Sequence, residues 1–259
     1  MRHKILFIKL AALGDVAAAA RSLVDSFGKI PEKAEFHWLL DRSYRPLAHS
    51  LLSTLGFHGV QFHDFDTTAL FQGTTARKIL STAGFLKKCT KTAPTAIVLL
   101  HRDFRYRLAL KTIFRVPLYT FRDTNQNETV LYTEVLERMR LELFSTHAPP
   151  QSSDISRPLV ETNHIGILVG GGVNTRGIFL EKRWPHLTDF IKKILDHSKF
   201  KVTLFGGPED RDIANEIILT VARPRELSRL HNAVGQIPLE ELPLVLRKLH
   251  YFVTVDSGL

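Results

Sequence analysis

Short apolar runs alternate along this chain with longer segments that mix polar and apolar residues. Runs rich in aliphatic and β-branched residues lie at 4–10, 34–40, 96–100, 165–169, 201–205 and 251–255. Their length and composition are typical of buried strands. Strands that alternate with helical segments build α/β units on parallel sheets. The pattern therefore predicts an α/β fold.

Helices are clearest in the second half of the chain. Apolar residues between 187 and 195 recur at the spacing of one helical face, so a helix is expected to begin near Pro185, a residue suited to a first helical turn. A second helix is expected after residues 206–208, with Glu209 and Asp210 at its positive end. A third is expected over residues 239–249, entered through Pro238.

Residues 145–153 separate two parts of the chain. The segment contains the adjacent prolines Pro149 and Pro150 and has no periodic apolar face, which is typical of a linker. A chain of 259 residues is long enough for two domains. We therefore expect an N-terminal domain at residues 1–150 and a C-terminal domain at residues 158–259.

The first twenty residues imitate a secretory signal, because a basic start precedes an apolar stretch and an alanine run. Lys9 interrupts the apolar stretch and Asp15 precedes the alanines, whereas a signal needs an uninterrupted apolar core. We therefore expect a strand that runs into a helix. No run of about 18 apolar residues predicts a membrane span. The single cysteine, Cys89, favours a reducing compartment and a role as a small buried side chain.

The charge balance is basic. The chain has 35 lysines and arginines against 26 acidic residues, a formal net charge of +9. Such an excess favours anionic partners, which include nucleic acids, phospholipid head groups and phosphorylated sugars. Charge alone does not choose among them.

The first candidate site follows the first expected strand, where open α/β sheets place their ligands. Gly14 permits a tight turn or the close approach of a substrate, and Asp15 presents a carboxylate at the strand end. Asp15 could instead serve only as the N-cap of the next helix, which is common for aspartate.

The second candidate site is the glycine run at residues 170–172, followed by Asn174, Thr175 and Lys182. Glycines free backbone amides to bind an anion, and a lysine before a helix can place a charge on a phosphate. The alternative is a flexible turn. The chain has no Gly-x-Gly-x-x-Gly or P-loop motif, which argues against a simple dinucleotide or P-loop site.

The third candidate combines residues 206–210 with residues 256–259. An acidic residue beyond a strand end, here Glu209 or Asp210, accepts hydrogen bonds from ribose hydroxyls. The backbone amides after Asp256 are suited to a diphosphate. Each segment also has a structural alternative, since acidic residues compensate a helix dipole and Ser257-Gly258 can form a plain turn.

Taken in order, these segments resemble the signatures of the ADP-heptose:lipopolysaccharide heptosyltransferases, glycosyltransferase family 9. Residues 8–16 resemble the family's N-terminal signature, residues 170–174 and 182–185 its donor phosphate loop, residues 205–208 the next strand end, and residues 256–259 its terminal donor motif. The likeness extends along the whole chain, with few diagnostic positions in residues 43–150.

The resemblance implies a GT-B architecture, in which two Rossmann-like domains face each other across a cleft. It implies an inverting, metal-independent transfer of heptose from ADP-heptose to the lipopolysaccharide inner core, with the ADP-sugar as substrate and no cofactor. The family usually continues beyond its terminal donor motif. We therefore expect either that a tail is missing from the given sequence or that the second domain is incomplete.

The resemblance also implies roles for individual residues. The catalytic residues are Asp15 as general base and Lys182. The donor-binding residues are Gly171, Gly172, Asn174, Thr175, Lys182, Glu209, Asp210, Asp256, Ser257, Gly258 and Leu259. The acceptor-binding residues are Lys9, Gly14, Arg102 and Arg105, and no residue is expected to bind a metal.

The phosphorylated acceptor suits a basic, cytoplasmic protein in peripheral contact with the inner membrane. Arg102 and Arg105 follow the strand at 96–100 and are suited to its phosphates or to lipid head groups, although a solvated basic helix face is an equal alternative. Two other functions stay open. One is a nucleic-acid-binding protein, for which the chain has no known recognition module. The other is a degenerate family member that acts as an interaction protein.

Overall fold

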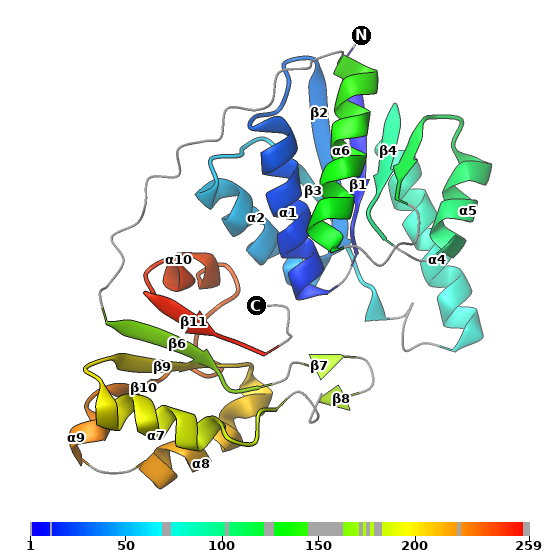
Figure 1. The fold of residues 1–259 in the computed structure, drawn as a ribbon. Coiled ribbons are helices and arrows are strands. Elements are labelled where there is room, and N and C mark those ends of the chain that lie inside the picture. The colour runs from blue at the N-terminus through cyan, green and yellow to red at the C-terminus, as the bar shows by residue number, and fades with distance from the viewer. Residues whose placement is uncertain are drawn as a thin grey trace. The chain divides into compact units, whose positions relative to one another are not determined.

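The computed structural model describes residues 2–10, 12–68, 74–101, 104–121, 127–144, 163–170, 173–174, 177–178, 183–221 and 224–255. The chain divides into two compact units, Met1–Ile155 and Ser156–Leu259 (Figure 1). In the described ranges, no helix is both long and apolar enough to cross a membrane.

The first unit is built on a five-stranded parallel sheet. Its strands are β1 (His3–Ile8), β2 (Ala34–Asp41), β3 (Gln61–Phe65), β4 (Ala96–Leu99) and β5 (Leu118–Thr120). They lie in the order β3-β2-β1-β4-β5, with His3 opposite Ala34 and Ile5 opposite Ala96. The direction of winding reverses at β1, so the topological switch point lies between β1 and β4. Open α/β sheets bind ligands at such a point.

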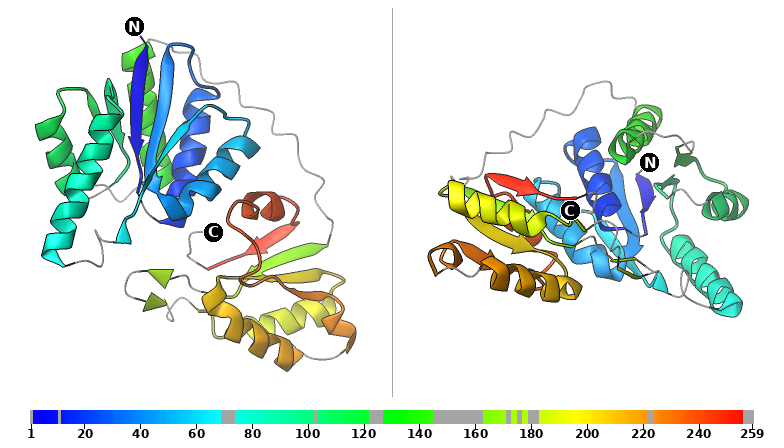
Figure 2. Two further views of the ribbon diagram at one scale, coloured as in Figure 1. Left: turned by 180° about the vertical axis from the view of Figure 1, so that it is seen from behind. Right: turned by 60° about the horizontal axis from the view of Figure 1, so that its bottom comes forward.

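Helices cover both faces of this sheet (Figure 2). One face carries α1 (Leu13–Phe27), α2 (Arg45–Thr54) and α6 (Glu128–Phe144), and the other carries α4 (Thr75–Lys91) and α5 (Phe104–Ile113). A short 3-10 helix, η1 (Arg42–Tyr44), joins β2 to α2. Phe7 and Phe36 pack into the first core, whereas Leu6 and Leu39 pack into the second. This alternation is expected of strands that are buried on both sides.

The second unit repeats this topology on a four-stranded parallel sheet. Its strands are β6 (His164–Leu168), β9 (Lys201–Phe205), β10 (Leu230–Asn232) and β11 (Tyr251–Val253), in the order β10-β9-β6-β11. The helices α7 (Leu187–His197) and α8 (Arg211–Val221) cover one face, and α10 (Leu242–Leu246) covers the other. The short helices η3 (Pro208–Asp210) and α9 (Pro224–Leu227) precede α8 and β10. The switch point of this sheet lies between β6 and β11.

The predicted α/β fold with parallel sheets is confirmed, and each of the six predicted strands is present within a few residues of its expected bounds. The third C-terminal helix is shorter than predicted. Only Leu242–Leu246 is α-helical, and turns flank it, because the Glu241 amide bonds to the Pro238 carbonyl and the Leu249 amide to the Leu246 carbonyl. The helix expected near Pro185 begins at Leu187.

Cys89 lies on α4 and is completely buried in the second core of the first unit. Burial raises the pKa of its thiol to about 12. A thiol that stays protonated at neutral pH is a poor nucleophile. Cys89 therefore behaves as the small buried side chain that the sequence suggests.

Candidate active site

Asp15 lies in the first turn of α1, the helix that follows β1 after a short loop. Its Oδ2 accepts a hydrogen bond from Lys9 Nζ at 2.5 Å. The Lys9 side chain is only 4% exposed, whereas that of Asp15 is 32% exposed. A buried ammonium requires a counter-charge, so this pair is firmly held while the carboxylate stays accessible to solvent.

Asp15 is not the N-cap of α1. That position belongs to Ala12, which makes no side-chain capping bond. Ala12 also has a φ of 72°, a left-handed conformation that disfavours residues other than glycine. Gly14 lies inside the helix, so the interpretation of Gly14 as the residue of the tight turn is wrong. The unusual backbone is at Ala12.

A second carboxylate faces the Lys9 ammonium from α6. Glu128 Oε2 lies 4.0 Å from Lys9 Nζ and accepts a hydrogen bond from the Tyr132 hydroxyl. The ammonium also lies 5.5 Å from the centre of the Tyr132 ring, within the range of a cation–π interaction. Glu128 and Tyr132 were not predicted from the sequence, because they are more than a hundred residues from Lys9 and no local pattern links them to it.

Asp41, the last residue of β2, is the centre of another polar cluster at the same edge of the sheet. Its carboxylate accepts four hydrogen bonds. The amide and hydroxyl of Ser43 donate at 2.9 and 2.6 Å, and those of Thr67 at 2.8 and 2.6 Å. Burial alone would raise the pKa of Asp41, but these bonds outweigh burial and hold the pKa below its ordinary value of 3.8. The carboxylate therefore joins the ends of β2 and β3 rather than acting as a base.

The position of Asp41 at the end of an apolar strand is a signal that could have identified it from the sequence, since a nearby strand end also identified Asp15. Tyr44 links the two carboxylates electrostatically. Burial raises the pKa of Tyr44, and the negative charges of Asp41 and Asp15 raise it further. The carboxyl edge of this sheet therefore includes the enclosed carboxylate of Asp41 and the accessible carboxylate of Asp15.

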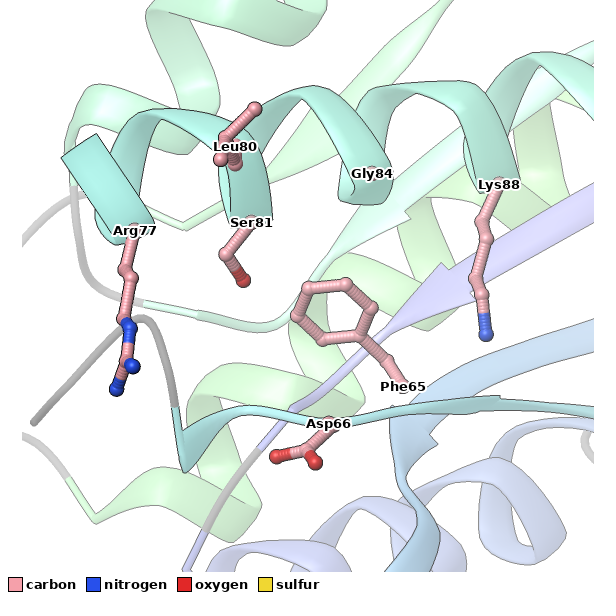
Figure 3. Close-up of a pocket in the computed structure, with 7 residues that line it drawn as sticks. All are labelled: Phe65, Asp66, Arg77, Leu80, Ser81, Gly84 and Lys88. Atoms are coloured by element: carbon pink, nitrogen blue, oxygen red, sulfur yellow. The ribbon is translucent and has the colours of Figure 1, made fainter. Parts of the chain in front are cut away.

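A pocket of about 470 Å³ lies between α4 and the end of β3 (Figure 3). It is lined by Phe65, Asp66, Arg77, Leu80, Ser81, Gly84 and Lys88. In Figure 3, Arg77, Ser81 and Lys88 are directed from α4 toward the strand end, whereas Leu80 is directed away from it. The order of the strands places β3 two positions from β1, so this pocket is distinct from the Lys9–Asp15 pair. It was not predicted from the sequence.

In the second unit, Asp210 is enclosed at the carboxyl end of β6. Its side chain is 3% exposed and accepts hydrogen bonds from the Gly207 amide at 3.1 Å and from Arg183 Nη2 at 3.3 Å. A Cβ atom on Gly170 would lie 2.0 Å from Asp210 Oδ2, so only glycine fits there. Glu209 is exposed. Of the two residues predicted to bind ribose, Glu209 is therefore the accessible one.

The remaining predicted site residues are placed only in part. Asn174 lies in β7 (Val173–Asn174), which forms a hairpin with β8 (Gly177–Ile178) after β6, with Asn174 opposite Gly177. Arg105 is exposed on α5. Outside the described residues lie Gly171, Gly172, Thr175, Lys182, Asp256, Ser257, Gly258, Leu259 and Arg102. Their roles stay predictions.

No group of three or more histidine, cysteine, aspartate or glutamate side chains in the described ranges is arranged to hold a metal ion. Independence from metal stays a prediction.

The two sheets and the strand-end residues define the class of the protein. It has two Rossmann-like α/β units, with an accessible carboxylate in the first turn of the helix that follows β1, the strand at which the first sheet reverses its winding. The family model for glycosyltransferase family 9 (heptosyltransferase) matches residues 125–259. The chain belongs to this family, and the predicted enzyme class, a glycosyltransferase, is confirmed.

Solved structures agree with this assignment. The chain is similar to E. coli ADP-heptose LPS heptosyltransferase II, with a TM-score of 0.63, 18% identity, and coverage of 98% of this chain and 80% of that chain. It is also similar to E. coli heptosyltransferase WaaC with ADP-2-deoxy-2-fluoro heptose, with a TM-score of 0.66, 14% identity, and coverage of 98% and 83%. A glycosyl transferase family 9 protein from Veillonella parvula matches with a TM-score of 0.62, 15% identity, and coverage of 99% and 76%.

At these identities the likeness establishes the GT-B fold class and no more. A search of curated proteins gave no significant match. How the two units face each other stays a prediction.

Proposed function

We propose that this protein transfers a heptose from ADP-heptose to the phosphorylated inner core of lipopolysaccharide, with inversion at the anomeric carbon and without a metal ion. Membership of the heptosyltransferase family supports the reaction. The similar WaaC was solved with an analogue of ADP-heptose, which supports the donor. The observation that carries the proposal is the accessible Asp15 carboxylate, fixed by buried Lys9 beside the first switch point.

Asp15 acts as the general base in this proposal. Lys9 holds Oδ2, and the carboxylate takes the proton from the acceptor hydroxyl as the hydroxyl oxygen attacks the anomeric carbon. The bond from that carbon to the diphosphate breaks on the opposite side, so ADP leaves and the configuration inverts. Lys9, which is buried, is a positioning residue in this step because it orients Asp15.

The second unit binds the departing diphosphate in this proposal. Lys182 and the backbone amides of Gly171, Gly172 and Gly258 stabilise its developing charge, as preorganised donors do in other transferases. Asn174 and Thr175 add hydrogen bonds, and the exposed Glu209 accepts from the ribose hydroxyls.

The acceptor determines where the protein works. The lipopolysaccharide core is built on a lipid anchor, so we place the protein in the cytoplasm, in peripheral contact with the inner membrane. In this part of the proposal Gly14, Arg102 and Arg105 bind the acceptor, and Lys9, predicted from the sequence to bind it as well, contributes through Asp15.

The base is tested by Asp15→Asn, which keeps the shape of the side chain and removes its basicity. Transfer from ADP-heptose to a lipopolysaccharide core acceptor should fall by about 10²- to 10⁴-fold, the usual contribution of a positioned base, while ADP affinity is unchanged. Asp25→Asn is the matched control, because Asp25 lies on the same helix in an exposed ion pair with Arg21. Transfer by Asp15→Asn within tenfold of the unsubstituted protein would exclude Asp15 as the base.

The donor site is tested by calorimetric titration of ADP into the protein and into Lys182→Ala. A charge-assisted hydrogen bond contributes about 1.5–3 kcal/mol, so affinity should fall by roughly ten- to a hundredfold. Lys193→Ala on α7 is the control, because Lys193 is exposed. Equal affinity of the Lys182 variant would remove that residue from the site. Failure of the folded, unsubstituted protein to bind any nucleoside diphosphate or its sugar would favour the interaction protein instead.

A further inference from the structure

The net positive charge of this protein comes from one stretch of the chain. Residues 67–121 contain ten lysines and arginines and a single acidic residue, Asp103. Their excess of positive charge equals the formal net charge of +9 of the whole chain, so the rest of the sequence is balanced. A charge distributed only to aid solubility would be spread more evenly.

The fold gathers this charge on two neighbouring helices. α4 and α5 cover the same face of the first sheet and pack together, since the rings of Phe85 and Tyr106 lie 5.1 Å apart. All nine lysines and arginines of residues 74–101 and 104–115 are exposed, and these ranges contain no acidic residue. We call the exposed side chains of α4 and α5, together with Arg115, the basic face.

Aliphatic side chains are exposed on the basic face among the cations. The exposed fractions are 65% for Ile79, 72% for Leu80, 63% for Leu108 and 46% for Ile113, and Figure 3 shows Leu80 directed away from the neighbouring strand end. Exposed aliphatic groups beside lysines and arginines are typical of helices that lie in a membrane interface. There the cations meet anionic head groups and the apolar groups enter the acyl boundary.

We infer that the basic face docks on the surface of a bilayer that contains anionic phospholipids. Charge complementarity selects an anionic partner, and the exposed aliphatic groups select lipid over nucleic acid. Proteins that bind single-stranded nucleic acid stack bases on exposed aromatic rings, but the aromatic side chains that the structure describes on α4 and α5, Phe85 and Tyr106, are 0% and 8% exposed. This inference rests on the proposed function and deepens it. It specifies the surface that brings the enzyme to a lipid-linked acceptor.

The test is flotation of the whole chain with vesicles of phosphatidylethanolamine and phosphatidylglycerol, compared with vesicles of phosphatidylcholine alone. The protein should float only with the anionic vesicles and should be released by salt. Lys87→Gln/Lys91→Gln/Lys111→Gln should lower the partition coefficient on the order of 100-fold, since each lysine near an anionic surface contributes about fivefold. Equal flotation of this variant, or no flotation of the unsubstituted protein, would overturn the inference.

The matched control is Lys193→Gln/Lys199→Gln/Lys201→Gln, which removes three exposed lysines from the second unit and should leave flotation unchanged. If the control variant lowers flotation as much as the triple variant of the basic face does, vesicle binding depends only on the net charge of the protein, and the inference is wrong.

Insertion of the aliphatic groups is measured separately. Ile79→Ser/Leu108→Ser should lower the partition coefficient at least roughly tenfold, because two buried aliphatic side chains are lost from the interface. Unchanged partition would show that no apolar group enters the bilayer and would overturn this part of the inference. A fluorescent oligonucleotide provides the competing outcome, since salt-sensitive binding to it in the absence of vesicle binding would identify a nucleic-acid surface. Calorimetric ADP binding separates these results from the proposed function, because it requires no membrane.

Discussion

The buried Lys9 ammonium allows a sharp test of the candidate site by stability alone. Its Nζ lies 2.5 Å from Asp15 and 4.0 Å from Glu128, and the two carboxylates are 32% and 29% exposed. Asp15→Asn or Glu128→Gln removes one counter-charge and leaves the other. The double variant removes both carboxylates that face the buried ammonium in the described part of the chain, which is the costly situation for a charge.

The expected magnitudes follow from that geometry. At 4 Å and an effective dielectric constant of about 20, the gross attraction of two unit charges is about 4 kcal/mol, and solvent reduces it for carboxylates that are about one-third exposed. Each single variant should therefore cost about 1 kcal/mol of the free energy of unfolding. The double variant should cost about 4 kcal/mol, in the range for breaking a buried ion pair, so the coupling energy is about 2 kcal/mol.

Urea unfolding measures these changes, with the slope m as a check that the denatured state is unaffected. The chain has one tryptophan in each unit, Trp38 buried in the first and Trp184 exposed in the second. A Trp184→Phe background makes Trp38 fluorescence report on the first unit alone. Asp25→Asn is the control, since its ion pair with Arg21 is exposed and should contribute less than about 0.5 kcal/mol.

Two results would refute this reasoning. Additive losses, with a coupling energy below about 0.3 kcal/mol, would mean that the two carboxylates do not share the ammonium. The triple variant Lys9→Met/Asp15→Asn/Glu128→Gln removes the uncompensated charge and should recover most of the stability lost in the double variant. A triple variant as unstable as the double variant would show that the loss comes from packing rather than charge.

Three further expectations concern stability. Asp41→Asn should cost about 2–3 kcal/mol at pH 7, because a donor then replaces one acceptor. The difference in the free energy of unfolding between this variant and the unsubstituted protein should become smaller below pH 3.8, because protonation removes the stabilisation that the lowered carboxylate pKa provides. A difference that does not change between pH 7 and about 3 in urea unfolding would contradict this. Burial lowers the pKa of His63, and the neighbouring His37 lowers it further. The contribution of neutral His63 to the free energy of unfolding is therefore fully present above pH 6.5 and decreases below it. His63→Phe should flatten that fall in thermal melts between pH 7 and about 5, and an unchanged slope would count against it. Gly170→Ala should cost at least about 2 kcal/mol in urea unfolding because its Cβ would meet Asp210, whereas Gly84→Ala, with open space around its Cβ, should gain about 0.5–1 kcal/mol; equal effects would contradict the close approach.

The strands could be predicted where burial on both sides of the sheet produces continuous aliphatic runs, as in β1, β2 and β9. β3 (Gln61–Phe65) was missed because it is an edge strand with only two apolar residues among five, and most of it is only partly buried. β10 (Leu230–Asn232) is likewise a short edge strand. Edge strands need less apolar surface, so composition signals them weakly.

Site residues could be predicted only where they lie close in the sequence to the end of a predicted strand. Asp15 could be identified because it lies within a few residues of a strand end in the sequence. Glu128 could not, since its approach to Lys9 depends on how α6 packs against α1. The sequence also could not show which of Glu209 and Asp210 is accessible to a ligand. That difference depends on the contacts of Asp210 with Gly207 and Arg183, which enclose its side chain.

The uneven distribution of charge has a kinetic consequence. A body that is neutral except for one cationic region experiences a torque near an anionic surface, and that torque turns the region toward the surface before contact. Raising the ionic strength should therefore slow the capture of the protein as well as speed its release, because collisions would then occur in random orientations.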